Sequence, residues 1–144
     1  MRLCLPQPFE DLGHVADVGV RVRGATAGEA LARLVLAFAS LAAGGGEVHA
    51  EREERLSVEG GPGLAGTAVA LLRELLYRLA IEGILPAACE VHSVGEAGAE
   101  VSVAFGRRDP ARHAEGLDLK AVTRHAARLE PEGAGWVGQV LFDV

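Results

Sequence analysis

The chain has 144 residues, of which 49% are hydrophobic, and a formal net charge of −6. This length is typical of one domain, so we expect residues 1–144 to form a single domain. The acidic balance argues against broad affinity for nucleic acids, which needs a basic face, and no apolar run reaches the ~18 residues of a membrane-spanning helix, so we expect a soluble, cytoplasmic protein with no membrane partner.

The first half of the sequence predicts a strand, a helix and a second strand. Valines at positions 18, 20 and 22 alternate with polar residues or glycine, which is the period of a half-buried strand beginning at or just after Asp17. Thr26 and Glu29 have the spacing of a capping box, and apolar residues follow at helical spacing until Gly44–Gly46. Residues 51–59 alternate again and predict the next strand.

The second half predicts one helix and four strands. The helix runs from about Leu64 to Ile81, and Gly83 supplies its C-terminal stop. Strands are expected at 89–94, 99–105, 119–129 and 136–143, with a charged loop at 106–116 and a turn at 130–135. Two helices are too few for a doubly wound parallel sheet. We therefore expect an α+β domain with a mixed, largely antiparallel sheet and both helices packed on one of its faces.

Acidic groups lie near both ends of the chain. Asp17 stands just ahead of the first predicted strand, and the sequence ends in Asp143 and Val144, which adds an α-carboxylate. If the sheet brings these ends together, three anionic groups converge. Converging carboxylates repel one another unless a cation neutralises them, which indicates a hard divalent ion bound by oxygen ligands.

Each part of this pattern also has a simpler interpretation. Asp17 and His14 could form a local pair at a turn, and Asp143 alone could be a solvated terminus. The G-x-G-x-x-G pattern at residues 61–66 could be a nucleotide loop, but Pro62 removes a backbone donor and the preceding strand is charged, so we favour a plain strand-to-helix turn. Cys4 and Cys89 have no metal-site spacing and are expected to be reduced and packed.

A further set of candidate residues lies in the strand predicted at 119–129. Thr123 and His125 share one face of this strand by simple alternation, whereas Lys120 is expected on the opposite face. Thr123 and His125 either make a hydrogen bond on the sheet surface or line the same acidic cleft as His14. Lys120 is the only lysine in the chain.

Four segments together resemble one known family. HVADVG at residues 14–19 is similar to the archease motif His-Thr-Ala-Asp-(Ile/Val)-Gly, and ELLY at 74–77 is similar to the central helix of that family. KAVTRH at 120–125 resembles its Lys-Ala-(Val/Ile)-Thr-Tyr-His strand, and GWVGQV at 135–140 with the terminal Asp143 resembles its closing strand. Val15 and Arg124 depart from the family pattern, which has Thr and Tyr at these positions.

The resemblance implies a function. Archeases are accessory proteins of the RtcB-type tRNA-splicing RNA ligase; they promote its guanylylation by GTP and its turnover, and they are not themselves enzymes. The resemblance also implies a divalent metal, most readily calcium, held by Asp17, Asp143 and an oxygen of Val144, and an indirect association with tRNA through the ligase. The alternatives are a small metal-dependent hydrolase using His14 or His125, and a chaperone-like interaction module with a structural metal.

Overall fold

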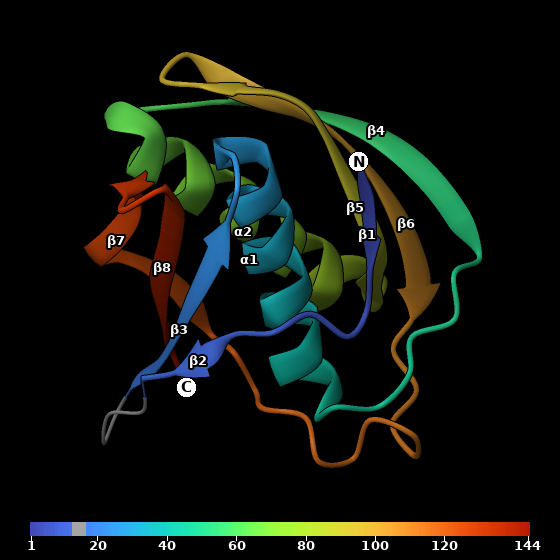
Figure 1. The fold of residues 1–144 in the computed structure, drawn as a ribbon. Coiled ribbons are helices and arrows are strands. Elements are labelled where there is room, and N and C mark those ends of the chain that lie inside the picture. Colours follow the sequence, from blue (N-terminus) through green and yellow to red (C-terminus); the bar gives the residue numbers. More distant parts are fainter. Residues whose placement is uncertain (13–16) are drawn as a thin grey trace.

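The computed structural model describes residues 1–12 and 17–144. Within these residues, two helices are enclosed by two four-stranded sheets (Figure 1). The elements in chain order are β1 (Arg2–Cys4), β2 (Glu10–Asp11), β3 (Asp17–Gly24), α1 (Ala27–Ala43), β4 (Arg52–Glu59), α2 (Gly63–Glu82), β5 (Ile84–Gly95), β6 (Gly98–Arg107), β7 (Ala121–Glu132) and β8 (Gly135–Asp143).

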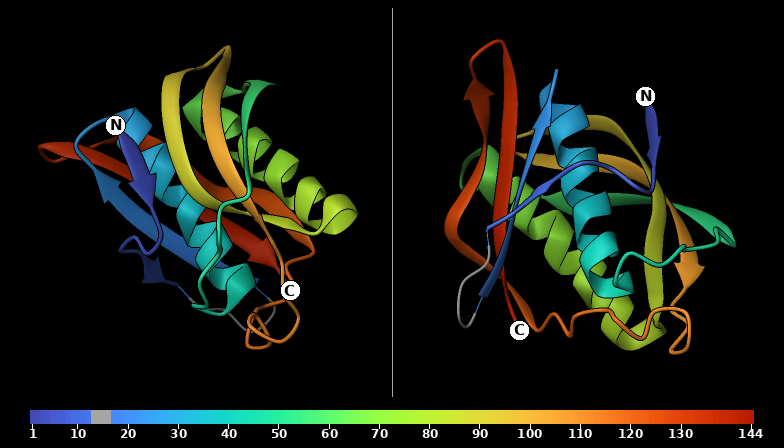
Figure 2. Two further views of the ribbon diagram at one scale, coloured as in Figure 1. Left: turned by 90° about the vertical axis from the view of Figure 1, so that its right-hand side faces the viewer. Right: turned by 60° about the horizontal axis from the view of Figure 1, so that its bottom comes forward.

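The described strand pairs are all antiparallel. One sheet has the order β1-β5-β6-β4, and the other has the order β2-β3-β8-β7. Both helices pack against strands of both sheets, so the core lies between the two layers (Figure 2). The α+β class and the antiparallel pairing that the sequence predicted are confirmed.

The strands are divided between two sheets, where the sequence analysis expected one sheet with both helices on a single face. The reason lies in α1, in which twelve of seventeen residues are buried. A helix that is apolar around most of its circumference must be covered on more than one side. One sheet covers only one side of α1, and the second sheet buries the rest.

The ends of α1 follow the predicted pattern. The Thr26 hydroxyl accepts a hydrogen bond of 3.1 Å from the Glu29 backbone N–H, as an N-cap side chain does. At the other end, Gly44 has a left-handed conformation with φ of 62°. Its backbone N–H donates to the Leu41 carbonyl, which closes the helix.

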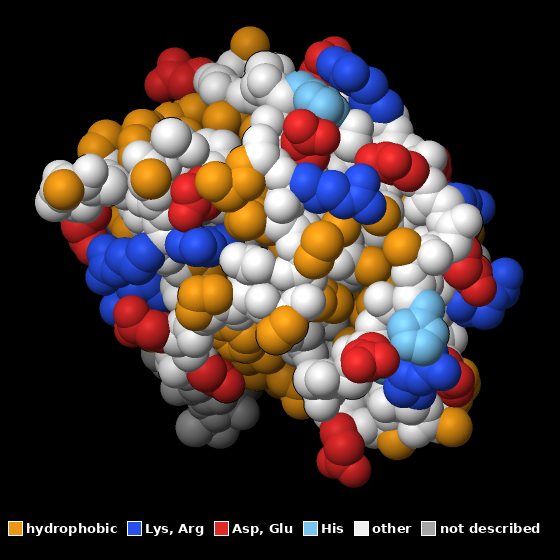
Figure 3. All heavy atoms as spheres, turned by 45° about the vertical axis from the view of Figure 1, so that its right-hand side comes forward, with side chains coloured by type: hydrophobic (Ala, Val, Ile, Leu, Met, Phe, Trp, Pro, Cys, Tyr) orange, Lys and Arg blue, Asp and Glu red, His pale blue; other side chains and the backbone are white. Residues whose placement is uncertain are grey.

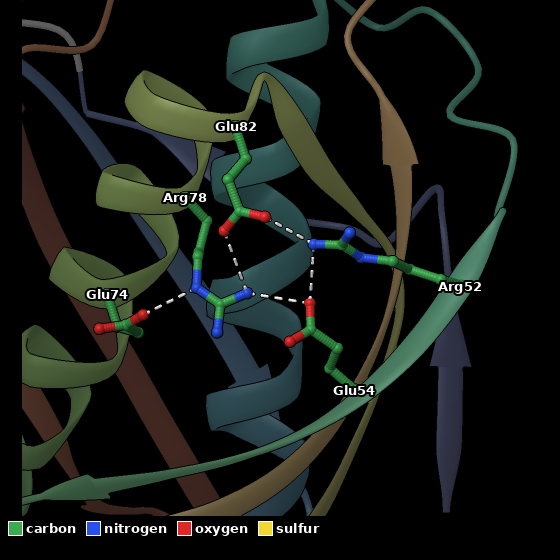
Figure 4. A network of polar contacts seen from close by, with 5 residues as sticks. All are labelled: Arg52, Glu54, Glu74, Arg78 and Glu82. Atoms are coloured by element: carbon green, nitrogen blue, oxygen red, sulfur yellow. Dashed lines mark hydrogen bonds and ion pairs between the residues drawn. The ribbon is translucent and has the colours of Figure 1, made fainter.

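A polar network joins α2 to the edge strand β4. The Arg78 guanidinium donates to Glu74 on its own helix and to Glu54 on β4, at 3.0 and 2.9 Å (Figure 4). Glu82 lies 3.4 Å from the same guanidinium and accepts a hydrogen bond from Arg52. Arg78 also lies over the Phe105 ring, 5.8 Å from its centroid, so this side chain links the helix both to β4 and to the core.

Neither described helix has the length and apolar character that crossing a membrane would require. On the face shown in Figure 3, acidic and basic side chains are intermixed, and hydrophobic side chains gather toward the middle of that face.

Candidate functional site

The first candidate residues meet at one end of the β3–β8 pair. Asp17, the first residue of β3, is directly opposite Asp143, the last residue of β8. Val18 and Phe142, the next pair along, pack in the core, so by strand alternation both aspartates lie on the outer face of the sheet. Directly opposed residues in an antiparallel pair have Cβ atoms about 4.5–5.5 Å apart, and like charges at such positions destabilise the pair.

Val144 and Lys120 adjoin this pair of aspartates. Val144 follows Asp143 and is 42% exposed. On the other side of β8, Asp143 is opposite Ala121 of β7, and the Lys120 backbone N–H donates to the Asp143 carbonyl over 2.8 Å. The residue that precedes β7 is therefore hydrogen-bonded to the end of β8 that carries Asp143.

A wide bulge interrupts β7 beside the site. Thr123 is paired with Leu141 and Arg128 with Gln139, so four residues, 124–127, stand opposite a single residue of β8. Ala126 within this bulge has a left-handed conformation with φ of 57°, which is unfavourable for a residue with a Cβ. Bulges of this kind are frequent beside functional sites, where they redirect side chains.

The side chains of Gln139 and Arg21 hold the bulge in place through hydrogen bonds. Gln139, which is 7% exposed, donates through Nε2 to the Ala126 carbonyl over 2.8 Å. Its Oε1 accepts a hydrogen bond of 2.9 Å from Arg21 Nε. Arg21 also forms an ion pair with Glu10 of β2. The chain Arg21–Gln139–Ala126 thus connects β3, β8 and β7 across the outer face of the sheet.

The bulge borders a cavity that reaches Asp17. The cavity has a volume of about 460 Å³ and is lined by Leu12, Asp17, Arg21, His125, Ala126, Gln139 and Leu141. Asp17 and His125 therefore face the same hollow. The His125 backbone N–H donates to the Thr123 hydroxyl over 3.1 Å. Thr123 and Lys120 lie earlier along the chain than the bulge and are not on the wall of this cavity as the described residues define it.

The structure leaves one candidate untested and adds two others. His14 and Val15 lie outside the described residues. Arg21 and Gln139 were not selected from the sequence. A signal for Arg21 existed, because it shares the face of Asp17 by the period of two. Gln139 could be recognised only from its register opposite Arg21.

The donor groups at this end of the sheet suit a hard cation. Within residues 1–12 and 17–144, no group of three or more Asp, Glu, His or Cys side chains is arranged to hold a metal ion. Asp17 and Asp143 supply two carboxylates, and among the described residues Val144, beside Asp143, has an oxygen that can serve as a further donor. An all-oxygen set of this type fits calcium or magnesium better than zinc.

The other sequence candidates have structural roles. Residues 60–62 form a turn from β4 to α2, in which the Thr67 hydroxyl accepts a hydrogen bond of 3.3 Å from the Gly61 N–H. A Cβ at Gly66 would collide with the Gly61 backbone, so close packing accounts for this glycine. Both cysteines are free. Cys89 is buried as expected. Cys4 is exposed because its neighbour Leu3 packs against the core, so strand alternation turns Cys4 outward, and the expectation that Cys4 is packed was wrong.

Comparison with known proteins finds relatives that match almost the whole chain. The model of the archease protein family (MTH1598/TM1083) matches residues 9–144. The protein archease of Methanopyrus kandleri is 33% identical over 140 residues, which are 95% of this chain and 99% of that protein. The protein archease of Pyrococcus furiosus is 30% identical over 94% of this chain and 98% of its own length.

Two solved structures share the fold. The solution structure of Methanobacterium thermoautotrophicum protein 1598 has a TM-score of 0.68 at 21% identity and covers 94% of this chain and 98% of its own. The crystal structure of an archease, described as a possible chaperone, from Thermotoga maritima has a TM-score of 0.59 at 17% identity and covers 97% and 98%. The match of the family model across almost the whole sequence shows that this chain belongs to the archease family.

Proposed function

We propose that this archease is a cytoplasmic activator of the RtcB-type tRNA-splicing RNA ligase, and that it promotes GTP-dependent guanylylation and turnover of the ligase without being an enzyme itself. The observation that carries the proposal is the direct opposition of Asp17 and Asp143 in a member of this family. Association with tRNA is then indirect and occurs through the ligase.

We propose that the end of the sheet that carries Asp17 and Asp143 is the part of the archease that activates the ligase. Asp17, Asp143 and an oxygen of Val144 would hold a divalent ion, with calcium as the first candidate. When bound beside the phosphates of a nucleotide, such an ion supplies positive charge that offsets the charge developing during phosphoryl or nucleotidyl transfer. In this proposal, Asp17 and Asp143 keep that charge at the edge of the archease, where a partner can approach it.

The cavity next to Asp17 supports the same assignment. Asp17 lies at its wall with Arg21 and His125, so one acidic and two basic groups face a shared hollow. Arg21 is already engaged by Gln139 and Glu10, which leaves His125 as the group that can donate to a ligand or accept from one. The Gln139 hydrogen bond to the Ala126 carbonyl holds the loop that presents His125.

Guanylylation of the cognate ligase by radiolabelled GTP tests the proposal. We expect this archease at substoichiometric amounts to increase the rate of ligase guanylylation and the number of ligation cycles per ligase. We also expect the isolated archease to take up no covalent label. Stimulation that is absent at every archease concentration would contradict the proposal. Metal-dependent hydrolysis of phosphate esters by the isolated archease would instead favour the hydrolase alternative.

A chaperone-like role is the second candidate, because the Thermotoga maritima relative is described as a possible chaperone. In that case the acidic end of the sheet would have a structural purpose only. Removing divalent ions would then lower the melting temperature and leave ligase binding unchanged, whereas the activator proposal requires that ion removal abolish the stimulation of guanylylation.

A further inference from the structure

The outer face of α2 exposes large apolar side chains. Tyr77 is 58% exposed and Ile81 is 67% exposed. They are one turn apart, so they lie next to each other on the same face of the helix. An amphipathic helix normally places polar residues on the face it presents to water. The exposure of Tyr77 and Ile81 therefore suggests that this face of α2 contacts another molecule.

The chain that leads into β7 extends this apolar surface. The segment 117–122 runs beside α2, since the Arg73 guanidinium donates to the Val122 carbonyl over 3.1 Å. Closer to the C-terminal end of α2, a hollow of about 280 Å³ separates the helix from the segment. It is lined by Ala42, Leu76, Leu79, Ala80, Arg108, Gly116, Leu117, Asp118 and Leu119. Leu117, at its rim, is 40% exposed. We call Tyr77, Ile81, Leu117 and this hollow the α2 surface.

Positively charged side chains without ionic partners border the α2 surface. Most arginines of the chain are paired with glutamates, for example Arg55 with Glu100 at 2.9 Å. Arg73, Arg108 and Lys120 form no ion pair with any residue in the described part of the chain. In a protein with a net charge of −6, such a rim of unpaired cations is complementary to an acidic partner.

The α2 surface is also continuous with the acidic end of the sheet. Lys120 follows Leu119 of the hollow, and its backbone N–H donates to the Asp143 carbonyl over 2.8 Å. A partner seated on α2 would therefore have Asp143 and the exposed Val144 at its edge. This arrangement lets one contact both anchor the partner and place it against the proposed ion site.

We propose that the α2 surface docks a protein segment that carries carboxylates beside apolar side chains. This inference rests on the proposed function, in which the segment belongs to the RNA ligase. Apolar anchors enter the hollow between Ala80 and Leu117, and the carboxylates meet the cationic rim. A protein fits better than RNA because most of the hollow is lined by aliphatic side chains, which suit the apolar anchors of a protein segment.

Binding of the cognate ligase to immobilised archease, measured by biolayer interferometry, tests this inference. Ile81→Ser removes an apolar contact, and Arg108→Glu reverses one charge of the rim. Arg55→Glu is the control, since it makes the same charge change on β4 at a side chain that pairs with Glu100 of β6 and not with α2. All three positions are on the surface, so unchanged melting temperatures would confirm that the variants fold.

We expect Ile81→Ser to weaken ligase binding by about tenfold or more, as loss of an apolar anchor does. We expect Arg108→Glu to weaken it by about tenfold as well, because the new carboxylate would repel the carboxylates of the partner, and we expect Arg55→Glu to bind as the wild type does. Asp17→Ala should bind the ligase normally but fail to stimulate guanylylation. This difference separates docking from the ion site.

Three results would overturn the inference. If wild-type protein binds and stimulates the ligase, and Ile81→Ser and Arg108→Glu do so equally well, the docking surface lies elsewhere while the proposed function stands. If Arg108→Glu instead loses affinity for a labelled tRNA fragment and keeps its affinity for the ligase, the rim is a nucleic-acid surface. If the wild type neither binds nor stimulates the ligase, both proposals fail together.

Discussion

Asp17 stands directly opposite Asp143 across the β3–β8 pair, although the two residues come from opposite ends of the sequence. Their carboxylates occupy neighbouring positions on the outer face of the sheet. Like charges directly opposite one another in a sheet cost stability, by up to about 1 kcal/mol. A divalent ion bound between the two carboxylates would offset this repulsion, because each carboxylate is attracted to the ion.

The first prediction therefore concerns metal binding and stability together. Asp143→Asn should weaken calcium binding by at least about tenfold, because it removes one of two charged ligands. With chelator present, the same substitution should leave stability unchanged or raise it by a few tenths of a kcal/mol, because it relieves the repulsion. Isothermal titration calorimetry and thermal unfolding measure the two effects. Equal calcium affinity in wild type and Asp143→Asn would contradict the prediction.

A second prediction concerns the side chain beneath the β7 bulge. Gln139→Leu keeps the approximate volume of the side chain but leaves the Ala126 carbonyl and Arg21 Nε without this partner. We expect it to lower the free energy of unfolding by about 1–3 kcal/mol. Gln139→Glu retains the acceptor for Arg21 and loses only the donor to Ala126, so its effect should be smaller. Denaturant unfolding compares the two variants, and an equal loss in both would show that the Arg21 bond contributes little.

The bulge itself supplies a third prediction. Ala126 has φ of 57°, a conformation in which glycine has no Cβ penalty. Ala126→Gly should therefore be neutral or stabilise the protein by up to about 1 kcal/mol, unlike most alanine-to-glycine changes. The control is Ala127→Gly in the same bulge, where φ is not positive and the substitution should destabilise. Chemical denaturation of both variants measures the difference, and destabilisation by Ala126→Gly comparable to that of Ala127→Gly would contradict this prediction.

How far the sequence predicted this structure depends on the range of the interactions involved. Alternation at Val18, Val20 and Val22 and the capping pattern at Thr26 located β3 and α1 correctly, since both patterns are local. The division into two sheets depends on which strands pair, and local periodicity carries no such information. The bulge at 124–127 was missed for the same reason. The sequence analysis assumed that strand alternation continues from Thr123 to His125. In the structure the register shifts after Thr123, and Gln139, which is distant in sequence, holds the Ala126 carbonyl by a hydrogen bond.

The network at Arg78 provides a fourth prediction. The hydrogen bond from Arg78, together with its charge, lowers the pKa of the Glu54 carboxyl below its ordinary value. A carboxyl with a depressed pKa in the folded state contributes stability above its unfolded pKa, near 4.3, and this contribution is lost as the pH falls through the lower folded value. Arg78→Met should destabilise the protein by about 1–3 kcal/mol at pH 7.

The pH dependence distinguishes this account from a simple loss of packing. If the ion pairs matter, the stability difference between wild type and Arg78→Met should shrink as the pH falls through the unfolded carboxyl pKa, near 4.3, and toward the lower folded pKa of Glu54. Urea unfolding across this range measures the difference. If the difference in free energy of unfolding between the two proteins stays constant with pH, Arg78 stabilises the protein through its contact with Phe105 alone.

A fifth prediction follows from the two free cysteines. Burial raises the pKa of the Cys89 thiol to about 12, so this group remains a thiol at neutral pH. Only the thiolate reacts readily with disulfide reagents, and Cys4 is the exposed cysteine. Native protein should therefore release one equivalent of chromophore with Ellman's reagent and two equivalents after unfolding. Rapid release of two equivalents from native protein would show that Cys89 is accessible through local opening.

The measurement that tests the central claim most directly is guanylylation of the cognate RNA ligase by wild-type archease beside Asp17→Ala and Asp143→Ala, after circular dichroism has shown that both variants fold. We predict strong stimulation by the wild type, loss of stimulation in both variants, and retained binding of both variants to the ligase. Full stimulation by either variant would contradict the claim that the paired aspartates form the working site.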